Sequence, residues 1–423
     1  AATGHDVLGI DVDAGKVEAY RRDIIPGYEP GLSDLVHEAL TRGKLRFMHT
    51  DEVAESLGEV VLVTTGTPVT DAGTVDLSQV ESALFWIKGK QPGESVITMK
   101  STVPPGTGVR LVETVLRDTS LKYVSNPEFL REGQAVQDWF HPDRIVIGRA
   151  DDQAMNVIEA LYDGIEAPKM ITDITSAEMI KYASNAFLAT KISFINEIAA
   201  LCDRLGATID DVSRGIALDP RISSSFLGAG MGYGGSCFPK DVRALDQLAS
   251  TNNHDFELLR SVITVNNRQR LLPLYALRER FGTLSGVRVS VLGVAFKPNT
   301  DDVREAPSLD LIRALVSEGA QVSAFDPKAM PAARSVVPTS VHLASDPLEC
   351  ADSAQAIVLV TEWPEIVNAD WEEIAGRSRP PRFLFDGRNA LDPRRMRAYG
   401  FDYQGVGRAK VRSAGDRLQV GIQ

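Results

Sequence analysis

One segment without glycine or proline, residues 176–205, constrains the fold of this chain most strongly. Apolar side chains populate more than one face of this segment, among them Ile180, Phe187 and Ile195. The pattern predicts a single long amphipathic helix that ends before Gly206. A helix this long and this apolar packs between domains or between subunits, so we expect it to join two domains and to form a homodimer seam.

Short apolar runs alternate with helical stretches before this helix. The segments 7–11, 59–64 and 95–100 are predicted strands, and the last two are followed by loops of turn-forming residues. Two further strands are expected at 122–125 and 143–148. This alternation is typical of a parallel sheet covered by helices, in which loops at the carboxyl ends of the strands bind ligands.

The last third of the chain repeats the pattern. Strands are predicted at 287–292, 321–326, 356–360 and 382–386, with a helix near 308–318. The fold class is therefore α/β, with two Rossmann-like doubly wound domains joined by the long central helix. Residues after about Gly407 carry little apolar pattern, and we expect a loose tail there.

Composition narrows the possible functions. A net charge of −12 argues against general binding to nucleic acids or membrane surfaces, which requires a basic face. Cys202, Cys237 and Cys350 are widely spaced, so we expect no disulfide framework and no metal site. A reducing, cytoplasmic location follows. No apolar run approaches the ~20 residues that a membrane span needs.

Cys237 lies in the segment Gly232–Asp241, which is dense in special residue types. Gly232, Gly234 and Gly235 would let the backbone come close to a ligand. If a helix begins after Cys237, its positive end and Lys240 would lower the thiol pKa and favour a nucleophile. The alternative is a glycine-rich turn with a small packing cysteine, which is common in intracellular proteins.

Asp11 ends the strand predicted at 7–11. An acid that ends the second strand of a dinucleotide-binding fold accepts hydrogen bonds from the adenosine ribose and favours NAD over NADP. The fingerprint G-x-G-x-x-G, which should stand ~20 residues earlier, does not precede Asp11, because only ten residues do. We expect the first strand and its glycine loop to be missing from the start of the chain. The alternative is that Asp11 is an ordinary acid at a strand end.

Two polar pairs are candidates for a site. Lys181 and Asn185 share one face of the long helix, where donors could stabilise an oxyanion; a helix–loop hydrogen bond is the alternative. Glu128 and Glu132 lie near a predicted strand end, as a general base or polar wall, or as two solvated carboxylates.

Three loop arginines, Arg221, Arg304 and Arg388, offer cationic groups for a pyrophosphate in this acidic protein. Each alone is more typical of a solvated ion pair.

Taken together, these motifs resemble the UDP-glucose/GDP-mannose dehydrogenase family over nearly the whole chain. Several separate motifs occur in the family's order, which makes a chance match very rare. They are Tyr28–Gly31, Gly66–Pro68, Ser101–Val103, Asn126–Gly133, Asp143–Gly148, Lys181 with Asn185, Gly232–Asp241, Phe296–Pro298 and Asp386–Asn389.

The resemblance implies an NAD-dependent, four-electron oxidation of UDP-glucose to UDP-glucuronate. Cys237 would form a thiohemiacetal and then a thioester, and Lys181 and Asn185 would stabilise oxyanions. Glu128 would act as acid or base in hydrolysis, and Asp241 and Thr102 would orient water or relay a proton.

The resemblance also assigns binding residues and domains. Arg221 would reach the sugar of the neighbouring subunit in the homodimer. Expected domains are residues 1–172 (NAD), 173–280 (central, dimerising), 281–407 (sugar nucleotide) and a tail, 408–423. NAD contacts are expected at Asp11, Lys16, Thr67, Thr102, Glu132, Lys240 and Arg304, and substrate contacts at Glu128, Phe129, Leu130, Arg131, Lys181, Asn185, Arg221, Tyr233, Gly234, Phe296, Lys297 and Arg388.

Two alternatives stay open on the sequence. One is another nucleotide-sugar dehydrogenase, of the GDP-mannose type. The other is a sugar-nucleotide binder whose catalysis is impaired by the short start, although Cys237, Lys181 and Asp241 would serve no purpose in it.

Overall fold

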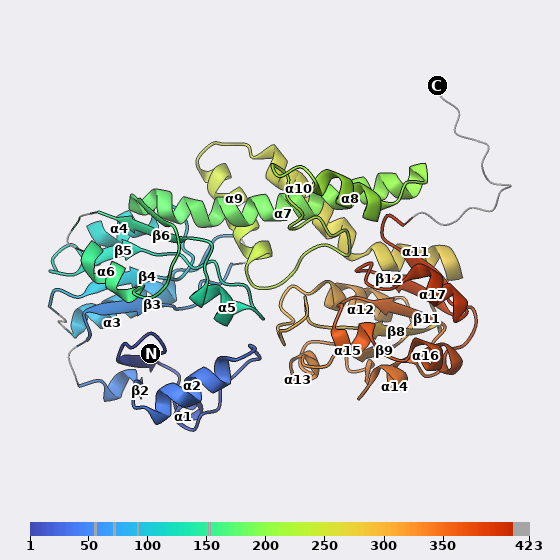
Figure 1. The fold of residues 1–423 in the computed structure, drawn as a ribbon, viewed down its shortest axis with the longest axis horizontal. Helices are drawn as coiled ribbons and strands as arrows, with labels where there is room; N and C mark the ends of the chain where they lie inside the picture. The colour runs from blue at the N-terminus through green and yellow to red at the C-terminus, as the bar shows by residue number, and fades with distance from the viewer. Residues whose placement is uncertain (55–56, 71–72, 91–92, 151, 153, 409–423) are drawn as a thin grey trace. The chain divides into compact units, whose positions relative to one another are not determined.

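The computed structural model describes residues 1–54, 57–70, 73–90, 93–150, 152 and 154–408. They form two compact units, unit 1 (residues 1–186 and 240–256) and unit 2 (residues 187–239 and the described residues from 257 onward). Figure 1 labels most of their helices and strands. Within the described part of the chain, no helix has the length and apolar character that a bilayer crossing requires.

Unit 1 contains two separate sheets. The larger has the strand order β3-β4-β5-β6-β7, and the smaller consists of β1 and β2 in parallel. The elements are β1 (Val7–Asp11), α1 (Ala14–Arg21), α2 (Leu32–Thr41), β2 (Leu45–His49), the 3-10 helix η1 (Thr50–Glu52), β3 (Val60–Val63), α3 (Ser78–Gly89), β4 (Val96–Met99), α4 (Thr107–Glu113), β5 (Lys122–Ser125), α5 (Ala135–Phe140), β6 (Ile145–Arg149), α6 (Met155–Leu161) and β7 (Lys169–Thr172).

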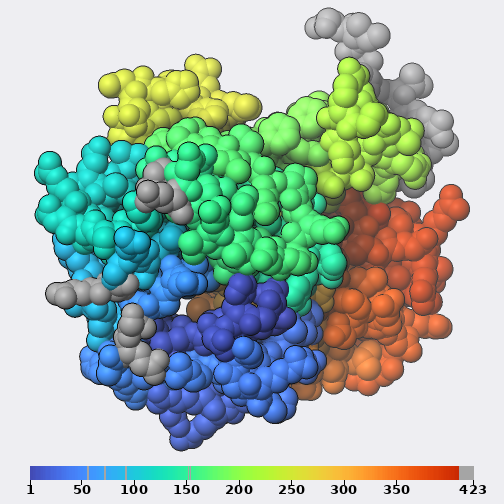
Figure 2. Space-filling view, turned by 60° about the vertical axis from the view of Figure 1, so that its left-hand side comes forward, coloured from blue at the N-terminus to red at the C-terminus, as the bar shows by residue number. Residues whose placement is uncertain are grey.

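The predicted strand at 7–11 is present as β1, and in the described structure it pairs with β2 alone. Ile10 and Met48 of this small sheet pack against the core cluster that contains Leu84 and Ile97. In Figure 2 an opening lies between the dark blue first residues and the lighter blue part of the same unit. The small sheet is therefore attached to unit 1 by side-chain packing rather than by strand pairing.

One strand pair departs from the predicted parallel arrangement. β5 and β6 are antiparallel, through Val124–Arg149 and Ser125–Gly148. The connection between them contains only the six-residue helix α5, which is too short to form the usual crossover over the sheet. Strands β2 and β7 were not predicted, because neither has a continuous apolar run.

The predicted long helix is present as α7 (Ile174–Leu205). It continues from unit 1 into unit 2, as does α9 (Phe238–Thr251). Each of these two helices therefore contains residues of both units.

Unit 2 is built on a six-stranded parallel sheet with the order β10-β9-β8-β11-β12-β13. Helices lie on both sides of it, α12 on one face and α14 and α16 on the other. The order reverses direction beside β8, so the loops after β8 and β11 leave the same sheet edge at a switch point. The remaining elements are α8 (Ile209–Ala217), α10 (Glu257–Arg270), α11 (Leu272–Phe281), β8 (Arg288–Leu292), α12 (Pro307–Ser317), β9 (Gln321–Phe325), α13 (Met330–Ala333), β10 (His342–Leu343), α14 (Pro347–Ala351), β11 (Ala356–Leu359), α15 (Pro364–Val367), α16 (Trp371–Arg377), β12 (Phe383–Asp386), α17 (Pro393–Ala398) and β13 (Asp402–Gly405).

The core of unit 2 joins its sheet to the helical region in one cluster. Ile195 of α7 and Ile209 of α8 are buried with Val291 and Phe385 of the sheet. Arg408, the first residue of the predicted tail, is held by hydrogen bonds. Residues 409–423, the rest of that tail, lie outside the described residues.

Candidate functional site

Lys181 and Asn185 of α7 point their polar ends at two different carboxylates of unit 1. Lys181 Nζ donates to Glu128 Oε1 over 3.1 Å, and Asn185 Nδ2 donates to Asp241 Oδ2 over 2.6 Å. Both side chains are buried, so each needs a partner. The structure thus brings together four of the predicted catalytic residues as two neighbouring pairs.

Glu128 is fixed in the loop that follows β5. Its Oε2 accepts a hydrogen bond from the backbone N–H of Leu130, and its Oε1 faces Lys181. The ring of Phe129 lies 3.8 Å from the Arg144 guanidinium carbon and 5.2 Å from Lys181 Nζ. Glu128 therefore has a defined orientation with one oxygen held by the backbone.

Asp241 lies in the first turn of α9 and is almost completely buried. Its Oδ1 accepts a hydrogen bond from Lys240 Nζ over 2.6 Å, and its Oδ2 accepts the Asn185 amide. Lys240 Nζ also lies 3.5 Å from Thr67 Oγ1. Lys240 thus lies beside both Thr67, a predicted cofactor contact, and Asp241, a predicted catalytic residue.

Lys100, at the end of β4, was missed by sequence reasoning. Its Nζ donates to Asn126 Oδ1 over 3.2 Å and to Tyr162 Oη over 3.3 Å. Burial lowers the pKa of Lys100 to about 8, while the charge of Glu128 acts in the opposite direction and that of Lys181 adds to the decrease. A lysine that directly follows a fully buried apolar strand was the signal available in the sequence.

The residues expected to hold NAD include three at the carboxyl ends of parallel strands. Asp11 ends β1, and Thr67 and Thr102 lie in the loops after β3 and β4. Asp11 Oδ1 accepts the backbone N–H of Asp13, and Oδ2 lies 3.9 Å from Lys16 Nζ. Asp11 is only partly buried and can still accept a hydrogen bond from a ribose hydroxyl, so these residues fit a dinucleotide.

Cys237 belongs to unit 2 and directly precedes α9, a helix of 14 residues. The helix on which the proposed activation of this thiol depends is therefore present. Cys237 Sγ lies 3.5 Å from Ser236 Oγ, and the residue is partly exposed. Cys202 and Cys350 are both buried, and burial raises the pKa of Cys350 to about 12. Cys237 alone of the three cysteines combines access with a helix start.

The glycines before Cys237 approach the protein's own backbone and rings. A Cβ on Gly235, whose φ is 85°, would lie 2.7 Å from the ring of Phe296. A Cβ on Gly234 would overlap the carbonyl oxygen of Glu305. We predicted close approach to a ligand at these positions, and the structure shows close packing against unit 2 itself.

Helix α10 holds this glycine run from one side. Asn266 Oδ1 accepts the backbone N–H of Tyr233 over 2.8 Å. Arg270 Nη2 donates to the carbonyls of Tyr233, over 3.1 Å, and Glu305, over 3.0 Å. Both α10 side chains are buried. Sequence reasoning missed their role because their partners are backbone groups or, for the pair of Arg270 with Asp310, a side chain distant in sequence.

Arg388 lies in the turn after β12 and holds three segments. Its Nε donates to Val360 O over 2.6 Å, and its Nη2 to Phe296 O over 3.0 Å. Its Nη1 donates to Gly232 O over 3.3 Å. This arginine therefore joins the loops after β8 and β11 to the glycine run.

The other predicted site residues are placed as follows. Arg221 is 88% exposed and pairs with Asp219, and Arg304 is 68% exposed and pairs with Asp302. Lys297 Nζ lies 5.3 Å from the ring of Phe296. Arg131 pairs with Asp138 within unit 1. Tyr233 packs edge-on against Phe238, and Glu132 lies in the loop that follows Glu128.

Models of one protein family match three successive parts of the chain. Residues 1–166 match the NAD binding domain of the UDP-glucose/GDP-mannose dehydrogenase family. Residues 175–268 match its central domain, and residues 290–393 match its UDP binding domain.

Individual relatives extend over nearly the full chain. UDP-glucose 6-dehydrogenase YwqF of Bacillus subtilis is 42% identical over 416 residues, covering 97% of this chain and 94% of the relative. A UDP-glucose 6-dehydrogenase of Rhizobium meliloti is 42% identical, covering 96% and 94%. The solved UDP-glucose dehydrogenase of Pyrobaculum islandicum superposes with a TM-score of 0.88 at 37% identity, covering 96% and 94%.

Proposed function

Because this chain belongs to the UDP-glucose/GDP-mannose dehydrogenase family, we propose that it oxidises UDP-glucose to UDP-glucuronate with NAD. We choose UDP-glucose as the substrate because relatives named as UDP-glucose 6-dehydrogenases are about 42% identical to this chain over nearly its whole length. The oxidation removes four electrons from C6, so each UDP-glucose requires two NAD and one water. NAD, when bound, accepts the hydride in each of the two oxidations.

Cys237 is the nucleophile in this proposal. Its sulfur adds to C6 of the intermediate aldehyde and gives a thiohemiacetal, and oxidation of that adduct leaves a thioester. Water then attacks the thioester carbon, the C–S bond breaks, and the Cys237 thiol returns with release of the carboxylate. The position of Cys237 directly before α9 supports this role, because a helix N-terminus favours a thiolate.

Lys181 and Asn185 stabilise the negative oxygen that develops at C6 in each step. Glu128 serves as acid or base in hydrolysis, and its contact with Lys181 Nζ holds its carboxylate in place. Asp241 and Thr102 orient water or relay the proton of the alcohol. The burial of Asp241 between Asn185 and Lys240 favours an orienting part for it.

Binding follows the division into an NAD binding domain and a UDP binding domain. NAD contacts are assigned to Asp11, Lys16, Thr67, Thr102, Glu132, Lys240 and Arg304. The sugar nucleotide is assigned to residues 128–131, Lys181, Asn185, Tyr233, Gly234, Phe296, Lys297 and Arg388.

A homodimer with α7 at its seam completes the proposal. Phe187, Phe194 and Leu201 of α7 are spaced by seven residues, which places them on one helix face, and they are 66%, 54% and 50% exposed. Leu218, just after α8, is 82% exposed. An apolar stripe of this kind on a water-facing helix is typical of a subunit interface.

Arg221 reaches the partner's site in this dimer. Its loop is tied to the seam helix, because Lys191 Nζ donates to Ile222 O over 2.9 Å. The side chain of Arg221 is 88% exposed, which leaves it accessible to a second subunit.

The activity is tested by counting NADH at 340 nm. The intact protein should release two NADH per UDP-glucose. Cys237→Ser should lower the rate of UDP-glucuronate release at least about 100-fold, because the thioester no longer forms. Cys202→Ala, which removes a buried cysteine of α7, is the matched control and should stay within about twofold of the intact protein.

Two results would contradict the proposal. Full UDP-glucuronate output from Cys237→Ser would exclude the covalent route. A clear preference for GDP-mannose in a substrate panel would exclude UDP-glucose as the substrate.

A further inference from the structure

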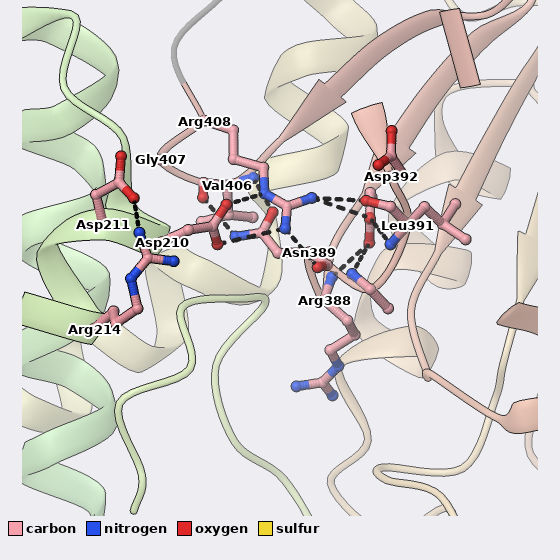
Figure 3. A network of polar contacts seen from close by, with 12 residues as sticks. Asp210, Asp211, Arg214, Arg388, Asn389, Leu391, Asp392, Val406, Gly407 and Arg408 are labelled. Carbon is pink, nitrogen blue, oxygen red and sulfur yellow. Dashed lines mark hydrogen bonds and ion pairs between the residues drawn. The ribbon is translucent and has the colours of Figure 1, made fainter. Parts of the chain in front are cut away.

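The guanidinium of Arg408 has a hydrogen-bond partner for every one of its donors. Nε donates to Asp210 Oδ2 over 2.7 Å, and Nη2 donates to Asp210 Oδ1 and to Asn389 O. Nη1 donates to Leu391 O over 2.9 Å and to Tyr403 Oη over 2.7 Å. Figure 3 shows this arginine between α8 and the turn after β12. Only the planar fork of arginine satisfies all these acceptors at once.

The turn that Arg408 holds is organised around a buried carboxylate. Asp386, the last residue of β12, is fully buried and accepts the backbone N–H groups of Arg388 and Leu391. Tyr403 Oη donates to Asp386 Oδ2 over 2.9 Å, and Arg408 Nη1 lies 3.9 Å from the same oxygen. Arg408 thus neutralises part of this buried charge and fixes both ends of the turn 386–391.

The same turn packs directly against the glycine run that precedes Cys237. Met231 N donates to Gly387 O over 3.0 Å, and a Cβ on Gly230 would lie 2.7 Å from that oxygen. Arg388 Nη1 reaches Gly232 O from the same turn. A shift of the turn by a fraction of an ångström must therefore be passed to the glycine run, because backbone meets backbone without an intervening side chain.

From these contacts we propose that Arg408 is a positioning residue for the cysteine-bearing segment. It acts through the turn 386–391 on the glycines 230–232, and so on the segment that ends at Cys237. This role deepens the proposed function, because it makes sugar-nucleotide binding depend on a residue that does not touch the ligand.

Arg408 also contacts Asp210 of α8, on the side away from the turn 386–391. Asp210 lies in the first turn of α8 and is itself partly exposed, with 44% of its side chain accessible. Backbone bonds hold the same junction, since Ile209 N donates to Gly407 O over 2.9 Å. Loss of the Asp210 carboxylate should therefore disturb the turn less than loss of the Arg408 fork.

The test uses the full chain and three variants, Asp210→Asn, Arg408→Lys and Arg408→Met. Hydrogen exchange of the backbone amides of residues 228–236 is measured by mass spectrometry, and it requires no activity. The second readout is the UDP-glucose concentration that half-protects Cys237 from iodoacetamide. Arg377→Gln is the control, because Arg377 forms exposed ion pairs in the same unit.

Arg408→Met should speed exchange of these amides at least about tenfold and raise the half-protection concentration by a similar factor, because the backbone packing around the turn is loosened. Arg408→Lys should give an intermediate effect and Asp210→Asn the smallest. KM for NAD should stay within about twofold, since Asp11 and Lys16 belong to the other unit. Arg377→Gln should change none of these quantities.

Exchange and protection in both Arg408 variants equal to those of Arg377→Gln would overturn the proposal, whatever the melting temperatures. An Asp210→Asn effect as large as that of Arg408→Met would also overturn it. If UDP-glucose fails to protect the intact protein, the proposed function fails, while the exchange data still decide the role of Arg408. If Arg408→Met does not fold, Arg408→Lys is compared with Asp210→Asn. A larger effect of Arg408→Lys on exchange and protection supports the proposal, and an equal or smaller effect overturns it.

Discussion

A buried charged side chain of unit 1, Glu178, has a shifted pKa. Glu178 of α7 is buried, and its carboxylate accepts the backbone N–H groups of Gly106, over 2.7 Å, and Gly108, over 2.8 Å. Burial raises the pKa of Glu178 to about 7, and the nearby charge of Asp173 adds to the increase. Glu178 thereby ties α7 to the loop that carries Thr102.

This pKa predicts a pH-dependent stability. Between pH 4.5 and about 7 the folded state holds a proton on Glu178 that the unfolded state has lost. The free energy of unfolding therefore falls as pH rises through this window, by on the order of 3 kcal/mol for this one group. Glu178→Gln should remove that part of the slope in urea titrations between about pH 5 and 7.5.

The matched control is Glu38→Gln, in an exposed ion pair with Arg42. It should leave the slope as in the intact protein. An unchanged slope in Glu178→Gln would show that the carboxylate has an ordinary pKa.

At the scale of elements, the loop before Cys237 is shaped by its surroundings more than by its own sequence. The glycines admit a backbone path that larger residues would block, but α10 and the loop after β8 determine that path. Asn266 and Arg270 bind its backbone, and Phe296 covers Gly235. The segment that ends at Cys237 therefore depends on two elements that are distant in sequence.

Gly235→Ala tests this dependence. The residue has a positive φ, and the new methyl group would meet the Phe296 ring, so unit 2 should lose more than about 1 kcal/mol of stability. Turnover should fall as well, because the segment that ends at Cys237 must shift. Thermal unfolding and NADH production measure the two effects.

Gly215→Ala in α8 is the control. A Cβ there meets no atom within 4 Å, so alanine should stabilise the helix by up to about 1 kcal/mol. Equal stability of Gly235→Ala and the intact protein would show that the loop can move away from Phe296.

The sequence predicted the elements with strong periodicity and missed those without it. The long helix and the buried strands β4, β8, β11 and β12 appear within one or two residues of the predicted bounds. The motif residues Lys181, Asn185 and Asp241 also came together. Lys100, Asn266, Arg270 and Arg408 were missed because their partners are backbone groups or distant side chains, and neither leaves a local pattern.

At the scale of the whole molecule, the residues assigned to the reaction are shared between two compact units. Lys181 and Glu128 belong to unit 1, and Cys237 and Arg388 belong to unit 2. The units are joined through the continuous helices α7 and α9, and α7 also carries the apolar stripe Phe187–Leu201. Pairing of two chains along this stripe would therefore fix the helix that carries Lys181 and Asn185, the residues proposed to stabilise the oxyanion.

A mixed-dimer experiment decides whether Arg221 works in the partner's site. Arg221→Ala and Cys237→Ser should each be strongly impaired as pure dimers. If Arg221 acts across the interface, a mixed dimer has one intact site, built from Cys237 of one chain and Arg221 of the other. Its second site carries both substitutions. Random mixing should then restore about a quarter of the intact activity, since half of the dimers are mixed and each has one working site of two. If Arg221 acted within its own chain, mixing would restore nothing. Adding Leu201→Asp to both chains should abolish the restoration, because a charge on the apolar stripe prevents pairing.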